Sequence, residues 1–102
     1  MKDIVIETLI VDEDREAHIA RHNITLDEVL EVLTGDYVFI AGREERWLLI
    51  GQTGDKRYLT IIVGERSEPH TFGLVTARPS RRTEKSFYSE FMTQKGGDTD
   101  EH

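Results

Sequence analysis

Apolar residues follow two different periods along this chain, and the periods predict its secondary structure. The segment Ile4–Val11 is rich in β-branched residues and predicts a first strand. A short helix is predicted over Asp12–His22, with Asp12 as its N-cap and acidic residues in its first turn. Thr25 to Glu28 has the form of a capping box, and the apolar residues after it recur at helical spacing. This second helix is predicted to end at Gly35 as a left-handed C-cap residue.

From Asp36 onward the pattern changes to short apolar runs separated by polar turns, which is typical of strands. Four strands are predicted, over residues 37–40, 46–51, 57–63 and 70–76. The third of these is the most apolar and is predicted to be central in the sheet. A last helix is predicted near Ser80–Met92, with Pro79 in its first turn and Phe87 and Phe91 on its inner face. The resulting order, β-α-α-β-β-β-β-α, predicts an α+β fold in which helices flank a mainly antiparallel sheet.

A chain of 102 residues is long enough for one domain with its own core. We expect that domain to span residues 1–93, followed by a disordered acidic tail over residues 94–102. The absence of cysteine excludes disulfides and thiolate chemistry and is compatible with the cytoplasm, which is the predicted location. No apolar run is long enough for a signal sequence or a membrane span, so no membrane association is expected.

The charge is distributed unevenly, and this changes the picture of what the protein binds. The formal net charge of −7 argues against a general nucleic-acid-binding protein, which would normally be basic. Residues 1–45 hold four basic and twelve acidic residues, whereas residues 66–88 hold five basic and two acidic residues. This asymmetry predicts one acidic face and one basic working face.

Clustered arginines are the best candidates for binding a phosphate group. Arg78 lies at the predicted end of a strand, and Arg81 and Arg82 open the last helix, so the three side chains could converge on one phosphate. Arg46 and Arg66, at the ends of neighbouring strands, would extend this basic patch. The alternative for each arginine is an ion pair with a nearby glutamate, such as Glu84, Glu44 or Glu45.

Candidates for proton transfer are fewer. His22 is a candidate general base near neutral pH, with a structural role at the end of the first helix as the alternative. Tyr88 could donate to a phosphate or act as an acid, or simply pack; Glu65 could be a base or form a salt bridge. His18 and His22 have the spacing of two metal ligands, but no third ligand is evident, so neither a metal nor another cofactor is expected.

Several segments in order resemble the BrnT family of small bacterial toxins, which are ribonucleases of the RelE-like superfamily. The matching segments, spread over about residues 11–88, are Val11-Asp12, Arg21-His22-Asn23-Ile24-Thr25-Leu26-Asp27-Glu28-Val29, Glu45-Arg46-Trp47-Leu48-Leu49-Ile50-Gly51, Glu65-Arg66, and Thr76-Ala77-Arg78 with Arg82, Glu84 and Tyr88. Asn23 stands where the family usually has glycine, and asparagine also tolerates a left-handed turn.

The resemblance implies a RelE-like fold and a toxin of a type II toxin–antitoxin pair that cleaves RNA without a metal and so inhibits translation. Arg78 and Arg82 would stabilise the phosphate, His22 and Tyr88 would assist catalysis, and Arg46, Arg66 and Arg81 would bind the substrate. The implied partner is a ribbon-helix-helix antitoxin; a homo-oligomer is also compatible with the sequence. The competing hypothesis is a non-catalytic protein-binding module of the same fold, which the acidic charge favours.

Overall fold

The structure is a computed structural model that describes the backbone of residues 4–100 and the side chains of residues 4–93. Its elements, in chain order, are β1 (Thr8–Ile10), α1 (Glu13–Ala20), α2 (Leu26–Thr34), β2 (Tyr37–Ala41), β3 (Arg46–Gln52), β4 (Tyr58–Glu65), β5 (Thr71–Pro79) and α3 (Arg82–Asp100). The predicted order and the α+β class are confirmed. Among the described residues, no helix combines the length and the apolar character that crossing a membrane requires.

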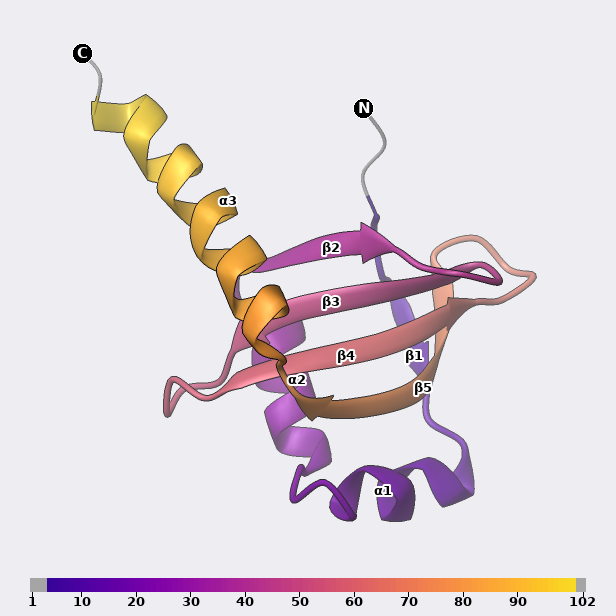
Figure 1. Cartoon of the computed structure of the whole chain (residues 1–102). Helices are drawn as coiled ribbons and strands as arrows, with labels where there is room; N and C mark the ends of the chain where they lie inside the picture. Colours follow the sequence, from indigo (N-terminus) through magenta and orange to yellow (C-terminus); the bar gives the residue numbers. More distant parts are fainter. Residues whose placement is uncertain (1–3, 101–102) are drawn as a thin grey trace.

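The five strands form one sheet in the order β1-β5-β4-β3-β2 (Figure 1). All neighbouring strands are antiparallel except β1 and β5, which are parallel and pair over only three residues. The central position predicted for the most apolar strand is confirmed, because β4 lies in the middle of the sheet. A β-bulge interrupts the β4–β5 ladder: Ile62 pairs with Thr76 but Val63 pairs with Leu74, so Val75 is the extra residue.

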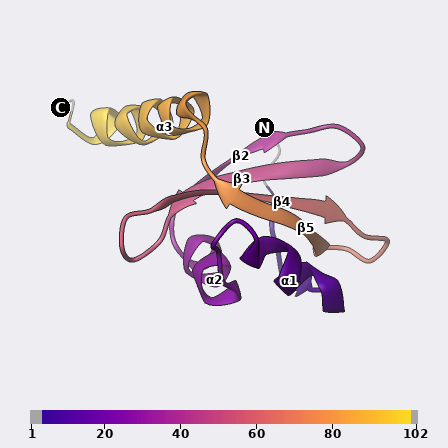
Figure 2. The same cartoon turned by 60° about the horizontal axis from the view of Figure 1, so that its bottom comes forward.

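The helices lie on both sides of this sheet. Figure 2 shows α1 and α2 packed under one face, while α3 leaves from the other face and extends away from the sheet. The main core lies between the sheet and the first two helices, and its fully buried members are Ile19, Ile24, Val29, Val32, Leu49, Leu59, Ile61, Val63 and Ala77. Val38 and Ile50 are also buried but lie on the opposite face, because they alternate with residues that face the main core.

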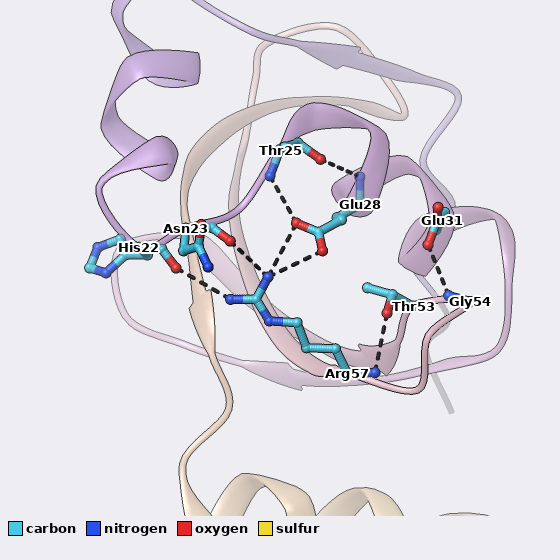
Figure 3. A network of polar contacts seen from close by, with 8 residues as sticks. All are labelled: His22, Asn23, Thr25, Glu28, Glu31, Thr53, Gly54 and Arg57. Atoms are coloured by element: carbon cyan, nitrogen blue, oxygen red, sulfur yellow. Dashed lines mark hydrogen bonds and ion pairs between the residues drawn. The ribbon is translucent and has the colours of Figure 1, made fainter.

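The start of α2 is held by the predicted capping box. Thr25 and Glu28 exchange their two side-chain-to-backbone hydrogen bonds, at 3.2 and 3.0 Å. Arg57, from the loop before β4, donates to the Glu28 carboxylate at 3.1 Å and to the carbonyl of Asn23 at 2.7 Å (Figure 3). Asn23 has a φ of 63°, so the left-handed turn expected at this position is confirmed. The Arg57 guanidinium thus ties the α1–α2 turn to the sheet.

One predicted boundary and one predicted conformation near the helix ends are wrong. Gly35 is the C-cap residue of α2, as predicted, but it has a φ of −102° and is extended rather than left-handed, because the chain runs directly on into β2. In the last turn of α2 the Thr34 hydroxyl donates to the carbonyl of Leu30 at 2.8 Å. Pro79 is the last residue of β5, opposite Leu59, and not part of the last helix. A strand end tolerates proline because the missing N–H is not needed there.

The first strand and the last helix also differ from expectation. Pairing with β5 covers only Thr8–Ile10, so the strand is shorter than the apolar run Ile4–Val11. The backbone of α3 is helical to Asp100 rather than ending near Met92. Phe87 and Phe91, predicted to face inward, are 39% and 44% exposed because α3 leaves the sheet. The division into a domain over residues 1–93 and a disordered tail stays a prediction, and residues 101–102 lie outside the described part.

Candidate functional site

One face of the sheet, on the side of α3, carries most of the arginines that the sequence singled out. We call it the outer face. Alternation along the strands and the pairing register place on it Arg46 and Leu48 of β3, Thr60, Ile62 and Gly64 of β4, and Gly73, Val75, Thr76 and Arg78 of β5. The opposite face is covered by α1 and α2, whereas α3 contacts β2 and β3 and, through Glu84 and Tyr88 near its start, also β4 and β5. A substrate can therefore reach the sheet only from the outer face.

At the α3 end of this face, Arg78 is bound by Glu84. The guanidinium donates two parallel hydrogen bonds to the carboxylate, at 2.8 and 2.7 Å, and both side chains are largely buried. Glu84 also accepts the backbone N–H of Arg81 at 2.8 Å and the Thr60 hydroxyl at 2.9 Å. The ion pair proposed from sequence as the alternative role of Arg78 is therefore present, and it joins β5 to the first turn of α3.

These contacts determine the protonation of Glu84. Burial by itself would raise the pKa of this carboxyl, but the hydrogen bonds from Arg78, the Arg81 backbone and Thr60 outweigh it and lower the pKa to about 2. The same pairing raises the pKa of Arg78. At neutral pH the two charges neutralise each other, so Arg78 offers little free charge to a phosphate.

The start of α3 nevertheless presents free positive charge. The side chains of Arg81, Arg82 and Lys85 are exposed here. Tyr88, one turn further, packs edge to face against Tyr58 with ring centroids 5.7 Å apart. Burial raises the pKa of Tyr88, so its phenol keeps its proton at neutral pH. Packing accounts for the position of Tyr88, and the protonated phenol can still donate a hydrogen bond to a ligand.

At the other end of the outer face lies an open cavity of about 450 Å³. Gly64 and Gly73 are paired across β4 and β5 and leave its floor without side chains. The Arg66 guanidinium lies directly over Gly73, where a Cβ atom would overlap it, and the Arg46 stem passes beside Gly64. The structure thus brings Arg46 and Arg66 together at this end of the outer face.

The two groups of arginines lie on one face but not at one point. Arg78 pairs with Thr60, and Gly73, under Arg66, pairs with Gly64. Four residues of β4 separate these positions, which corresponds to about 13 Å along the strand. The prediction that Arg46 and Arg66 extend the patch around Arg78 is therefore not supported; the arginines line two ends of a surface that a longer ligand could span.

His22 lies elsewhere. It follows α1, on the face of the sheet opposite α3, and its ring points away from the Arg57 network (Figure 3). Its carbonyl accepts a hydrogen bond from Arg57 at 3.4 Å, so the turn uses its backbone rather than its imidazole. The centroids of the His18 and His22 rings lie 6.0 Å apart. The described part of the chain contains no group of three His, Cys, Asp or Glu side chains that could hold a metal ion.

Glu65 is also turned away from its predicted partner. Its carboxylate accepts the indole N–H of Trp47 at 2.8 Å. Trp47 pairs with Val63 of the main core, so this contact lies on the face opposite to Gly64 and the Arg66 guanidinium. Glu65 anchors the tryptophan, and it also belongs to the lining of the cavity that Arg46 and Arg66 border.

The sequence did not identify the floor of the cavity or Asp12 as site residues. The available signal was glycine inside a strand, which often marks a close approach of another group. Gly64 and Gly73 carry this signal, but only the register shows that they are neighbours. Asp12, predicted simply as a helix cap, lines the same cavity.

Comparison with known proteins supports the fold. The sequence matches no protein-family model and no curated protein. The structure is similar to the crystal structure of the Brucella abortus ribonuclease toxin BrnT, with a TM-score of 0.56 and 17% sequence identity. The alignment covers 78% of this chain and all of the BrnT chain. The resemblance to BrnT expected from the sequence is therefore confirmed at the level of the fold.

Proposed function

We propose that this protein is an RNA-cleaving toxin of a toxin–antitoxin pair. The observation that carries the proposal is the outer face, where exposed arginines lie at both ends of an uncovered sheet. The likeness to a ribonuclease toxin supports the same function. The acidic residues that give the chain its net charge lie mainly in the first half of the sequence.

In this proposal the arginines have different roles. Arg46 and Arg66 bind a phosphate at the glycine floor, and Arg81 and Arg82 bind the RNA backbone at the start of α3. Arg78 is a positioning residue, because its bidentate pair with Glu84 fixes α3 against β5. No metal ion is required, since fixed guanidinium groups can stabilise the charge of the transition state.

The test is cleavage of RNA by the purified protein in the presence of EDTA. We expect wild-type protein to cleave and the variant R46A/R66A to lose about 10²-fold or more of the rate. Arg43 is an exposed arginine in the turn before β3, and R43A is therefore the matched control, expected to keep full activity. Intact RNA at high wild-type concentration would refute the proposal.

The partner in this proposal is a small ribbon-helix-helix antitoxin that covers the outer face, and the pair would act in the cytoplasm. Induced expression of the toxin alone should arrest growth, and co-expression with the product of the neighbouring gene should restore it. If the antitoxin restores growth but binds R46A/R66A as tightly as it binds wild-type toxin, its binding surface lies away from Arg46 and Arg66.

A second function is favoured by one observation. Phe87 and Phe91 are exposed one turn apart on α3, and the outer face also carries the partly buried apolar residues Leu48 and Ile62. A non-catalytic module would use such a surface to bind a protein partner. This alternative predicts no RNA cleavage and no growth arrest, together with tight binding of a partner that F87S/F91S abolishes.

A further inference from the structure

Asp12 occupies a helix-capping position but does not cap the helix. It is the N-cap of α1, where aspartate normally accepts a hydrogen bond from a backbone N–H of the first turn. Its side chain makes no such bond. The carboxylate instead lies 3.5 Å from the Arg66 guanidinium, and the Asp12 side chain is 61% exposed. A residue at a capping position whose side chain does not cap the helix often belongs to a functional site.

Asp12 is one of several charged residues that line the cavity. The charged residues that line the cavity with it are Arg15 and Asp14 of α1, Glu44 of the β2–β3 turn, Arg46 of β3, Glu65 of β4 and Arg66 after β4. Asp14 accepts from Arg15 with both its oxygens, at 3.3 and 3.1 Å, and Glu65 accepts the indole N–H of Trp47. Arg15 also donates to the carbonyl of Val75, the bulged residue of β5, at 2.8 Å. Asp12 is the lining carboxylate that forms an ion pair with a phosphate-binding arginine.

We propose that this cavity is the cleavage centre and that Asp12 is its proton acceptor, an inference that rests on the proposed RNA-cleaving function. The scissile phosphate lies over Gly64, where the absence of a side chain allows close approach, beside the Arg66 guanidinium that covers Gly73, and Arg46 and Arg66 bind its oxygens. The volume of about 450 Å³ is within the range of cavities that hold a small ligand. Asp12, beside Arg66, then faces the adjacent ribose.

The reaction balances with these groups. The Asp12 carboxylate takes the proton of the ribose 2′-hydroxyl, and the 2′-oxygen attacks phosphorus. The two arginines stabilise the negative charge that develops on the phosphate oxygens. The bond from phosphorus to the 5′-oxygen breaks, leaving a 2′,3′-cyclic phosphate. The 5′-oxygen takes a proton from water, which the open cavity admits, and Asp12 returns its proton to solvent.

The competing role for Asp12 is to orient Arg66 by an ordinary surface ion pair. The two roles predict different results for D12N. Asparagine caps a helix about as well as aspartate, so the fold is not at risk. If Asp12 is the proton acceptor, D12N loses that acceptor and cleaves more slowly. Its affinity for RNA should be equal or higher, because a negative charge has been removed from a phosphate-binding site. An orienting residue, in contrast, would affect mainly the affinity for RNA.

The experiment compares wild type, D12N and D27N in cleavage rate across pH and in binding of a non-cleavable RNA whose 2′-hydroxyls are methylated. We expect D12N to cleave about 10²–10⁴-fold more slowly, to bind the RNA at least as tightly, and to lose the fall in rate that a carboxylate base gives at acid pH. D27N changes an exposed aspartate in the first turn of α2, away from the cavity, and should keep its rate within a few-fold of wild type.

Two outcomes overturn the inference. If wild type cleaves and D12N cleaves with the same rate and pH profile, Asp12 is not the acceptor and the proposed function stands. If D12N loses affinity for the RNA in proportion to its rate, Asp12 orients Arg66. Failure of the wild-type protein to cleave any RNA would instead refute the proposed function, and this inference with it.

Discussion

The contact between Arg78 and Glu84 should make the stability of the fold depend on pH in a predictable way. The pKa of Glu84 is about 2 in the folded chain, against an ordinary value of 4.5. A carboxyl with this difference stabilises the folded state by about 3 kcal/mol at pH 7. Because the folded pKa is the lower one, the stabilisation is present above pH 4.5 and is lost as the pH falls toward 2. By pH 3.5 about 2 kcal/mol should remain.

The substitution E84Q tests this reasoning, because glutamine keeps the shape of the side chain but cannot ionise. The free energy of unfolding can be measured by urea denaturation, with the fluorescence of Trp47, the single tryptophan, as the signal. E84Q should be less stable than wild type by about 3 kcal/mol at pH 7, and the difference should shrink by about 1 kcal/mol at pH 3.5. E90Q changes an exposed glutamate of the same helix and serves as control.

Two results would refute it. A difference below about 0.5 kcal/mol at pH 7 would mean that the buried pair adds nothing beyond a surface contact. A large difference of the same size at both pH values would mean that glutamine disturbs packing and that ionisation of Glu84 is not the cause. The outcome also bears on function, because Arg78 positions α3 only if this pair is formed.

Three further substitutions test other parts of the structure. R57A removes the donor that links the α1–α2 turn to α2, so urea denaturation should show a loss of about 1–3 kcal/mol, with RNA cleavage unchanged at a temperature where the variant is folded. G73A should displace the Arg66 guanidinium, and G64A should place a methyl group where the phosphate approaches, so each should slow cleavage at least several-fold; wild-type rates for both would contradict the glycine floor. E45G replaces a non-glycine residue with a φ of 62° and should raise the free energy of unfolding by about 1 kcal/mol; a loss of stability would show that this turn is not strained.

Much of the fold was predictable because its signals are local. The capping box at Thr25 and Glu28 and the left-handed turn at Asn23 are read directly from adjacent residues. The last helix was harder, because α3 leaves the sheet and its apolar residues have no core to face. Phe87 and Phe91 look like core positions in the sequence and are exposed in the structure.

The site was predictable in its residue types but not in its arrangement. Arg46 and Arg66 were expected near each other, and strand pairing places them so. The separation of this pair from Arg78 depends on the register of β4 and β5, which includes a bulge that no local pattern reveals. His22 is close to the first strand in sequence, but the path of α1 under the sheet places it on the other face.

The most direct test of the account is RNA cleavage by the purified wild-type protein in EDTA, compared with R46A/R66A and R43A. The account predicts that wild type and R43A release fragments ending in a 2′,3′-cyclic phosphate and that R46A/R66A is slower by about 10²-fold or more. Cleavage by R46A/R66A at the wild-type rate would contradict the assignment of the outer face as the place where RNA is cut.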